Sequence, residues 1–219
     1  MADSEPTGLR TLYADDYLLV LHKPSGLLSV PGRGEDKQDC LSARAQKVYP
    51  DALIVHRLDM STSGLLLMAR GIAMQRLLNA AFAGREVAKR YVAVVAGVLA
   101  APERSTDGWA EIDLPISVDW PNRPLRKIDM EDGKPSRTRW RLLETLANAT
   151  RLELEPVTGR SHQLRLHLAA SGHAILGDAL YAPVEVQQQS SRLLLHARSL
   201  ALRHPHSGQA LSFEDPAPF

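Results

Sequence analysis

The sequence predicts an α+β fold, in which a mostly antiparallel mixed sheet is flanked by helices and loops. Two observations carry this prediction. Segments of strand length outnumber segments with helical periodicity, and they occur in hairpin-like clusters separated by short turns. No change in composition marks an internal boundary. We therefore expect one domain over residues 11–219, preceded by a loose tail over residues 1–10.

The first elements form a predicted hairpin. Residues 12–13 and 18–21 are short apolar segments on either side of the turn at 14–16, and Lys-Pro-Ser-Gly at 23–26 ends the second strand. Leu41, Ala45 and Val48 share one face of a short helix that ends at Pro50.

Two apolar runs, 53–55 and 65–68, predict buried strands that bracket a polar loop over residues 56–64. A helix should follow, because five apolar residues have helical spacing and Gly84 is a suitable end: Met74, Leu77, Leu78, Ala81 and Phe82. Residues 91–96 read as another buried strand. Polar loops held by buried strands are common places for functional residues.

In the second half, residues 137–143 and 151–155 alternate as strands do. A helix should then begin with Ser161 as its N-cap, run through Leu164 and Leu168, and end at Gly172. Residues 193–195 and 200–202 predict two late strands.

Composition places the chain among ordinary folded proteins. Its 219 residues are 44% hydrophobic and 23% charged, which is enough to bury a core without metal or disulfide support. The single cysteine, Cys40, excludes an intrachain disulfide and suits a reducing compartment. We find no secretory signal and no membrane span of about 18 apolar residues, so we expect a cytoplasmic protein without a membrane partner.

The net charge of +1 says little about partners, but its distribution is uneven. Residues 120–165 hold ten Lys and Arg against six Asp and Glu, a local excess of four. Within that stretch Arg137, Arg139 and Arg141 alternate, so a strand would present all three on one face. A nucleic-acid surface is one interpretation; a solvated edge strand guarded by charge is the interpretation that charge alone favours.

The loop over residues 56–64 carries the strongest motif, His-Arg-Leu-Asp-Met-Ser-Thr-Ser-Gly. Taken singly, Asp59 reads as a turn former and Arg57 as a surface charge. As a whole, the string resembles the signature of the RluA family of RNA pseudouridine synthases. Further likenesses follow in the family's order, from Lys-Pro-Ser-Gly-Leu-Leu at 23–28 and Lys-Arg-Tyr at 89–91 to Thr-Gly-Arg-Ser-His-Gln-Leu-Arg at 158–165, 172–178 and 194–197.

The resemblance covers roughly residues 18–205 and is nearest to the short dual-specificity members that act on rRNA and tRNA. Residues 119–124, Asp-Trp-Pro-Asn-Arg-Pro, are similar to a stretch of that subgroup. The core begins near residue 11, which leaves no room for the S4 RNA-binding domain of many relatives. The resemblance thus implies a single catalytic domain that binds structured RNA with its own loops, as a monomer.

The resemblance also implies the chemistry. Asp59 would be the catalytic carboxylate, either attacking the base or the sugar or stabilising a cationic sugar, and no cofactor or metal is needed. Tyr91 would pack against the flipped uracil, and Arg160 would pair with Asp59. Without the family, Tyr91 reads as a core residue and Arg160 as a structural charge beside a helix.

The remaining site residues are assigned to binding and to the pocket wall. RNA binding is expected of Arg57, Arg123, Lys127 and Arg165. Leu194 or Leu195 would line the pocket, with core packing as an equal alternative. Competing functions are a hydrolase or glycosylase that uses Asp59, a catalytically weak RNA-binding protein on the same fold, and a structural ribosome-associated factor.

Overall fold

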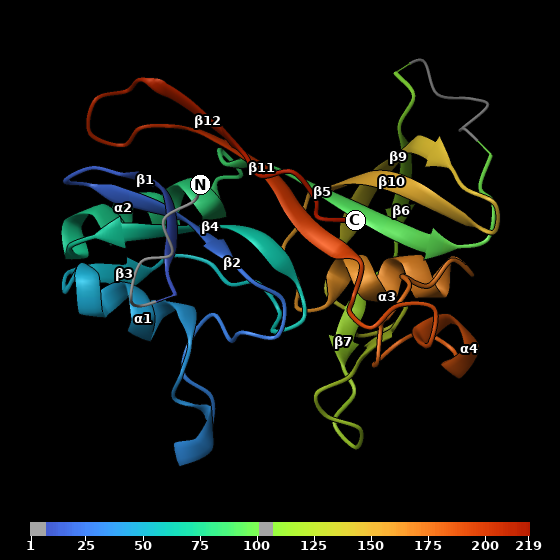
Figure 1. Ribbon diagram of the computed structural model, residues 1–219. Coiled ribbons are helices and arrows are strands. Elements are labelled where there is room, and N and C mark those ends of the chain that lie inside the picture. The colour runs from blue at the N-terminus through green and yellow to red at the C-terminus, as the bar shows by residue number, and fades with distance from the viewer. Residues whose placement is uncertain (1–7, 101–106) are drawn as a thin grey trace. The chain divides into compact units, whose positions relative to one another are not determined.

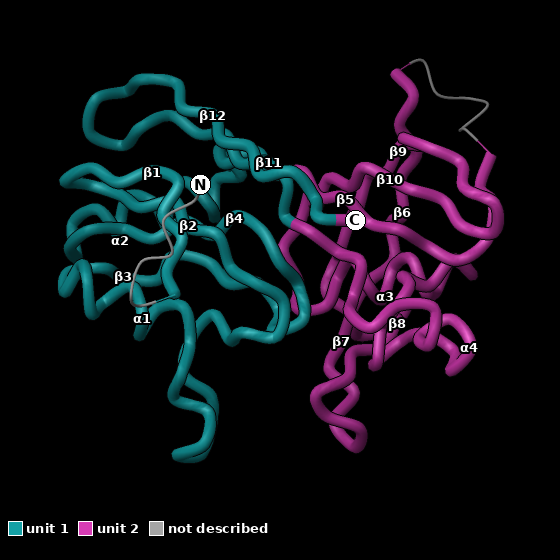
Figure 2. The backbone as a smooth tube through the Cα atoms, in the orientation of Figure 1, with its two compact units in different colours: residues 1–89, 197–218 teal, residues 90–196, 219 magenta. Residues whose placement is uncertain are grey.

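The computed structural model describes residues 8–100 and 107–219, so most of the tail expected over residues 1–10 lies outside the described residues. The chain divides into two compact units (Figure 2): residues 1–89 with 197–218, and residues 90–196 with Phe219. The single domain expected over residues 11–219 stays a prediction. No helix in the described residues is long and apolar enough to cross a membrane.

The first unit contains a sheet with the strand order β1-β2-β4-β11, to which β3 and β12 are added by pairing with β4 and β11 (Figure 1). Its strands are β1 (Arg10–Ala14), β2 (Leu18–Lys23), β3 (Ala52–Ile54), β4 (Ser63–Arg70), β11 (Leu195–Arg203) and β12 (Ala210–Glu214). Its helices are η1 (Glu35–Lys37), α1 (Leu41–Val48) and α2 (Ile72–Ala83).

The core of this unit lies between the sheet and α2. Leu18, Val20, Leu65 and Leu67 face the helix from alternate positions of β2 and β4, and Met74 and Leu78 reach them from α2. The helix spacing predicted for α2 is confirmed, as is its end at Gly84, whose backbone N–H donates to Ala80. Leu77 is an exception, because it is exposed rather than on the buried face.

The second unit contains an antiparallel sheet with the order β5-β10-β9-β6 and a separate two-stranded hairpin, β7–β8. Its strands are β5 (Ala88–Ala96), β6 (Ala110–Asp113), β7 (Ile116–Val118), β8 (Arg126–Ile128), β9 (Arg137–Thr145) and β10 (Ala149–Pro156). Its helices are α3 (Gln163–Ala170) and α4 (Val184–Gln187).

The α+β class and the mostly antiparallel sheet are confirmed, but three local predictions are wrong. Strand β9 pairs with β10 and β6, so it is not an edge strand. Helix α3 begins after His162, whose backbone has a left-handed conformation, and not after Ser161. The two strands expected at 193–195 and 200–202 form a single strand, β11, which begins at Leu195 and so leaves out residues 193 and 194.

Candidate active site

The signature loop connects β3 to β4 in the first unit. Its turn closes where the backbone N–H of Thr62 donates to the carbonyl of Asp59 at 3.1 Å. Thr62 and Ser63 are buried, Asp59 is half-buried, and Arg57 is exposed. The structure thus presents a carboxylate and a guanidinium from a short loop whose base is anchored in the core.

Lys23 supplies the central anchor of this loop. Its side chain is fully buried, and its ammonium donates to the carbonyls of Pro24 at 2.9 Å, Leu27 at 2.7 Å and Met60 at 2.9 Å. An ammonium has three donors, and a buried cation is tolerated only when it is well hydrogen-bonded. Lys23 therefore ties the end of β2 to the residue that follows Asp59.

Serine side chains extend the same connection. Ser25 donates to the carbonyl of Ser61 at 2.8 Å, and Gly26 N–H donates to that of Met60 at 2.9 Å. Ser29 both donates to the carbonyl of Leu58, at 2.7 Å, and accepts from its N–H, at 3.1 Å. The Lys-Pro-Ser-Gly motif thus holds the backbone that follows Asp59, and Ser29 holds the backbone that precedes it.

His56 holds the other end of the loop. The β3–β4 ladder ends at the pair Ile54 and Met68, and beyond it the Nε2 atom of His56 accepts the Leu67 N–H at 2.9 Å. The ring stacks on Phe82 with centroids 4.7 Å apart. Burial, and secondarily the charge of Lys89, lower the pKa of His56 to about 3. The imidazole is therefore neutral and continues the ladder as an acceptor.

Gly64 is required where the loop enters β4. Its φ is +112°, and a Cβ at this position would lie 2.3 Å from the carbonyl oxygen of Ala197. Any side chain would thus collide with the backbone of β11 while adopting a conformation that L-residues avoid.

The second unit contains the other residues expected at the site. Tyr91 lies on β5, where its side chain is largely buried, with 9% exposed. Leu195 is buried as well, and Leu194 packs against a core cluster that contains Val94 and Leu176. Of the two roles left open for Leu194, core packing is the one for which contacts are present.

The Thr-Gly-Arg block precedes α3, and Gln163 organises it from within the helix. Its Oε1 atom accepts from the Thr158 hydroxyl at 2.7 Å and from the Arg160 N–H at 3.0 Å. The N–H of Gln163 donates in turn to the carbonyl of Arg160 at 3.2 Å, so the residue closes the turn that leads into α3, and the side chain of His162 does not cap the helix. The side chain of Arg160 is exposed. Its pairing with Asp59 stays a prediction.

Arg165 is the buried arginine of the block. Its guanidinium donates to both carboxylate oxygens of Asp178, at 2.8 and 2.6 Å, and lies 5.4 Å from the centroid of the Tyr181 ring. Asp178 is itself 1% exposed and also accepts the N–H groups of Leu180 and Tyr181. Arg165, expected to bind RNA, is therefore an interior residue rather than part of an RNA-facing surface.

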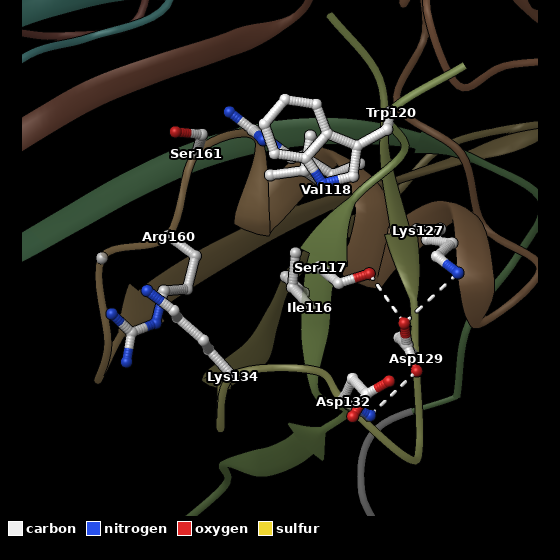
Figure 3. Close-up of a pocket in the computed structure, with 12 residues that line it drawn as sticks. Ile116, Ser117, Val118, Trp120, Lys127, Asp129, Asp132, Lys134, Arg160 and Ser161 are labelled. Carbon is white, nitrogen blue, oxygen red and sulfur yellow. Dashed lines mark hydrogen bonds and ion pairs between the residues drawn. The ribbon is translucent and has the colours of Figure 1, made fainter. Parts of the chain in front are cut away.

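A hollow of about 650 Å³ lies beside the β7–β8 hairpin and the start of α3 (Figure 3). Trp120, Gly159, Ser161 and the three residues of β7 line it. The rest of the lining consists of four cationic and two acidic side chains: Arg126, Lys127, Lys134, Arg160, Asp129 and Asp132. Asp129 accepts from Ser117 at 2.9 Å and pairs with Lys127 at 3.2 Å. Hydrogen bonds from the Asp132 backbone, Ser117 and Lys127 lower the pKa of Asp129 to about 2.

The alternating arginines of β9 do share one face, as predicted, but they are paired. Arg137 contacts Glu111 at 2.9 Å, Arg139 contacts Asp107 and Glu155, and Arg141 contacts Glu153. The guanidinium groups of Arg139 and Arg141 also lie 5.1 and 4.9 Å from the centroid of the Trp109 ring. These ion pairs could not be predicted from the sequence, because the carboxylates come from β10, from β6 and from the loop before β6.

The chain is similar to known proteins over most of its length. The family model described as RNA pseudouridylate synthase matches residues 17–170. The dual-specificity RNA pseudouridine synthase RluA of Escherichia coli K12 is 48% identical over 95% of this chain and 93% of its own, and that of Yersinia pestis is 46% identical over 95% and 98%. The structure of human RNA pseudouridylate synthase domain containing 1 covers 100% of this chain and 87% of its own, with 27% identity and a TM-score of 0.77.

Proposed function

This chain belongs to the RNA pseudouridylate synthase family, and on that premise we propose that it isomerises specific uridines in stem-loops of large-subunit rRNA, of tRNA anticodon arms, or of both. The observation that carries the proposal is the signature loop, which presents Asp59 from a backbone held by Lys23, Ser25 and Ser29. The relatives are named for dual specificity on RNA, which supports more than one kind of target RNA. We place the protein in the cytoplasm as a monomer.

The reaction suits a lone carboxylate. The bond from uracil N1 to ribose C1′ breaks, the base turns, and a bond from C5 to C1′ forms while C5 loses its proton and N1 gains one. No atom is added and no electron is transferred to another molecule. The Asp59 carboxylate would act covalently on the base or the sugar, or would stabilise a cationic sugar while the base rotates.

A uridine within a folded RNA must leave its stack before the carboxylate can reach it, at a cost of a few kcal/mol. We assign Arg57 to this step, because it is exposed and lies two residues from Asp59 on the same loop. We assign the aromatic face of Tyr91 to the flipped uracil, since base–aromatic stacking contributes roughly 1–3 kcal/mol. Arg160 is exposed, so we assign it to RNA contact, with pairing to Asp59 as the competing role.

Asp59→Asn tests the function. The amide is nearly isosteric but cannot act as a carboxylate, so conversion should fall at least about a thousandfold while RNA affinity stays within about threefold. Tritium release from RNA labelled at uracil C5 measures conversion, on a stem-loop and on a linear strand of the same sequence. Conversion near that of the unaltered enzyme would refute the role of Asp59, and equal conversion of both RNAs would refute stem-loop recognition.

The same experiment separates the alternatives. A glycosylase would release free uracil, whereas a pseudouridine synthase leaves the mass of the RNA unchanged. A catalytically weak RNA-binding protein would bind the stem-loop without releasing tritium.

A further inference from the structure

An exposed tryptophan stands on the loop between β7 and β8. Trp120 is 67% exposed, although residues of this size are usually well buried. The guanidinium of Arg123 lies 3.5 Å from the centroid of its ring. A guanidinium on one side of the indole supports the ring as a rigid platform and leaves a flat aromatic surface in contact with solvent.

The hollow beside Trp120 is lined by more cations than anions. Figure 3 shows the side chains of Lys134 and Arg160 together on one side of it, whereas Lys127 and Asp129 lie on the other. Among the described residues, no carboxylate forms an ion pair with Lys134 or Arg160. Two like charges repel at short range, so an anion bound between them would be stabilised by both.

Arg126 adds a donor to the same hollow. Its Nε atom is buried and has no hydrogen-bond partner in the described part of the chain. A buried donor that makes no hydrogen bond is unfavourable, and native proteins rarely leave one unsatisfied. The Arg126 guanidinium also lines the hollow, so its positive charge adds to that of Lys134 and Arg160 in attracting an anion.

We propose that this hollow binds a phosphate of the substrate RNA through Lys134, Arg160 and Arg126, while an adjacent unpaired base stacks on Trp120. The inference rests on the proposed function, because it names the part of the chain that holds the RNA. Aromatic platforms beside cationic grooves bind nucleotides in this way. The carboxylates of Asp129 and Asp132 also line the hollow, and the ion pair with Lys127 compensates the charge of Asp129.

The test measures the affinity of the full-length protein for a synthetic anticodon-arm stem-loop at several salt concentrations, with conversion followed in parallel. Trp120→Ala should raise the Kd about tenfold, whereas Trp120→Phe, which keeps an aromatic face, should stay within about threefold. RNA should quench tryptophan fluorescence less in Trp120→Phe than in the unaltered protein. Lys134→Ala should reduce the slope of log Kd against log salt by about one.

Lys47→Ala is the matched control, because Lys47 is exposed on α1 of the first unit and carries the same charge. Its salt slope should not change. Unchanged Kd values for both Trp120 variants, with an unchanged slope for Lys134→Ala, would overturn the proposal even if conversion is normal. Absence of conversion by the unaltered protein, with these binding effects present, would instead overturn the proposed function.

Discussion

Two groups of cations in the second unit differ in what surrounds them. The arginines of β9 each contact a carboxylate, and two of them also lie against Trp109. Lys134 and Arg160, by contrast, share a hollow and have no carboxylate partner among the described residues. Both groups contribute to the same basic excess over residues 120–165.

The difference shows that a charge count does not locate an RNA surface. A guanidinium that is already paired must give up its partner before it can bind a phosphate, so it contributes little net attraction. An unpaired cation contributes its full charge. The interaction surface should therefore follow Lys134 and Arg160 rather than the more conspicuous alternation of Arg137, Arg139 and Arg141.

The largest effect should come from removing a partner of a buried arginine. Asp178→Ala leaves the interior Arg165 without its bidentate partner, and such changes lower the free energy of unfolding by about 3–5 kcal/mol. Urea denaturation followed by circular dichroism measures the loss. Asp178→Asn, which retains an acceptor for the N–H groups of Leu180 and Tyr181, should lose less. A loss below about 1 kcal/mol for Asp178→Ala would contradict the assignment of Arg165 to the interior.

Arg160→Ala should have the next largest effect, and on binding rather than stability. Loss of an exposed, unpaired guanidinium should raise the Kd for the stem-loop about tenfold and leave the single-turnover rate at saturating RNA within about threefold. Arg160→Lys keeps the charge and should recover part of the affinity. Equilibrium binding and single-turnover kinetics provide the measurements. A single-turnover rate reduced well beyond threefold at saturating RNA would instead support pairing between Arg160 and Asp59.

The smallest effect is expected at β9. Arg139→Ala breaks ion pairs with Asp107 and Glu155 that are partly exposed, so the free energy of unfolding should fall by no more than about 1 kcal/mol. The salt slope of RNA binding should be that of the unaltered protein. A slope reduced as much as in Lys134→Ala would remove the distinction between paired and unpaired cations.

Much of the fold could be predicted because several elements have clear periodicity. The run at 65–68 lies in β4 of the core, and the spacing of Met74 and Leu78 matches the buried face of α2. The hairpin β7–β8 could not be predicted, since strands of three residues are too short to show a period. The start of α3 differs from the prediction by one residue, because His162 takes a left-handed backbone conformation before the first helical turn, which its residue type does not reveal.

The sequence indicates candidate residues for the site, but not how the fold supports them. The position of Asp59 in a polar loop between apolar runs was visible in the sequence. That Lys23 is buried and bound to Met60 was not, because a lysine beside a proline reads as a surface residue unless its partners are known. The exposure of Arg160 and the burial of Arg165 were likewise decided by tertiary contacts, since both lie in one short motif.

The close approach of Gly64 to Ala197 has a consequence for the order in which the loop is completed during synthesis. The upstream clamps, Lys23, Ser25 and Ser29, leave the ribosome before Asp59 does, so they are available as soon as the loop emerges. Ala197, whose backbone covers Gly64, is translated long afterwards. A nascent chain that ends before β11 therefore carries Asp59 on a loop whose far end is still uncovered, and the signature loop reaches its final form only after β11 has been made.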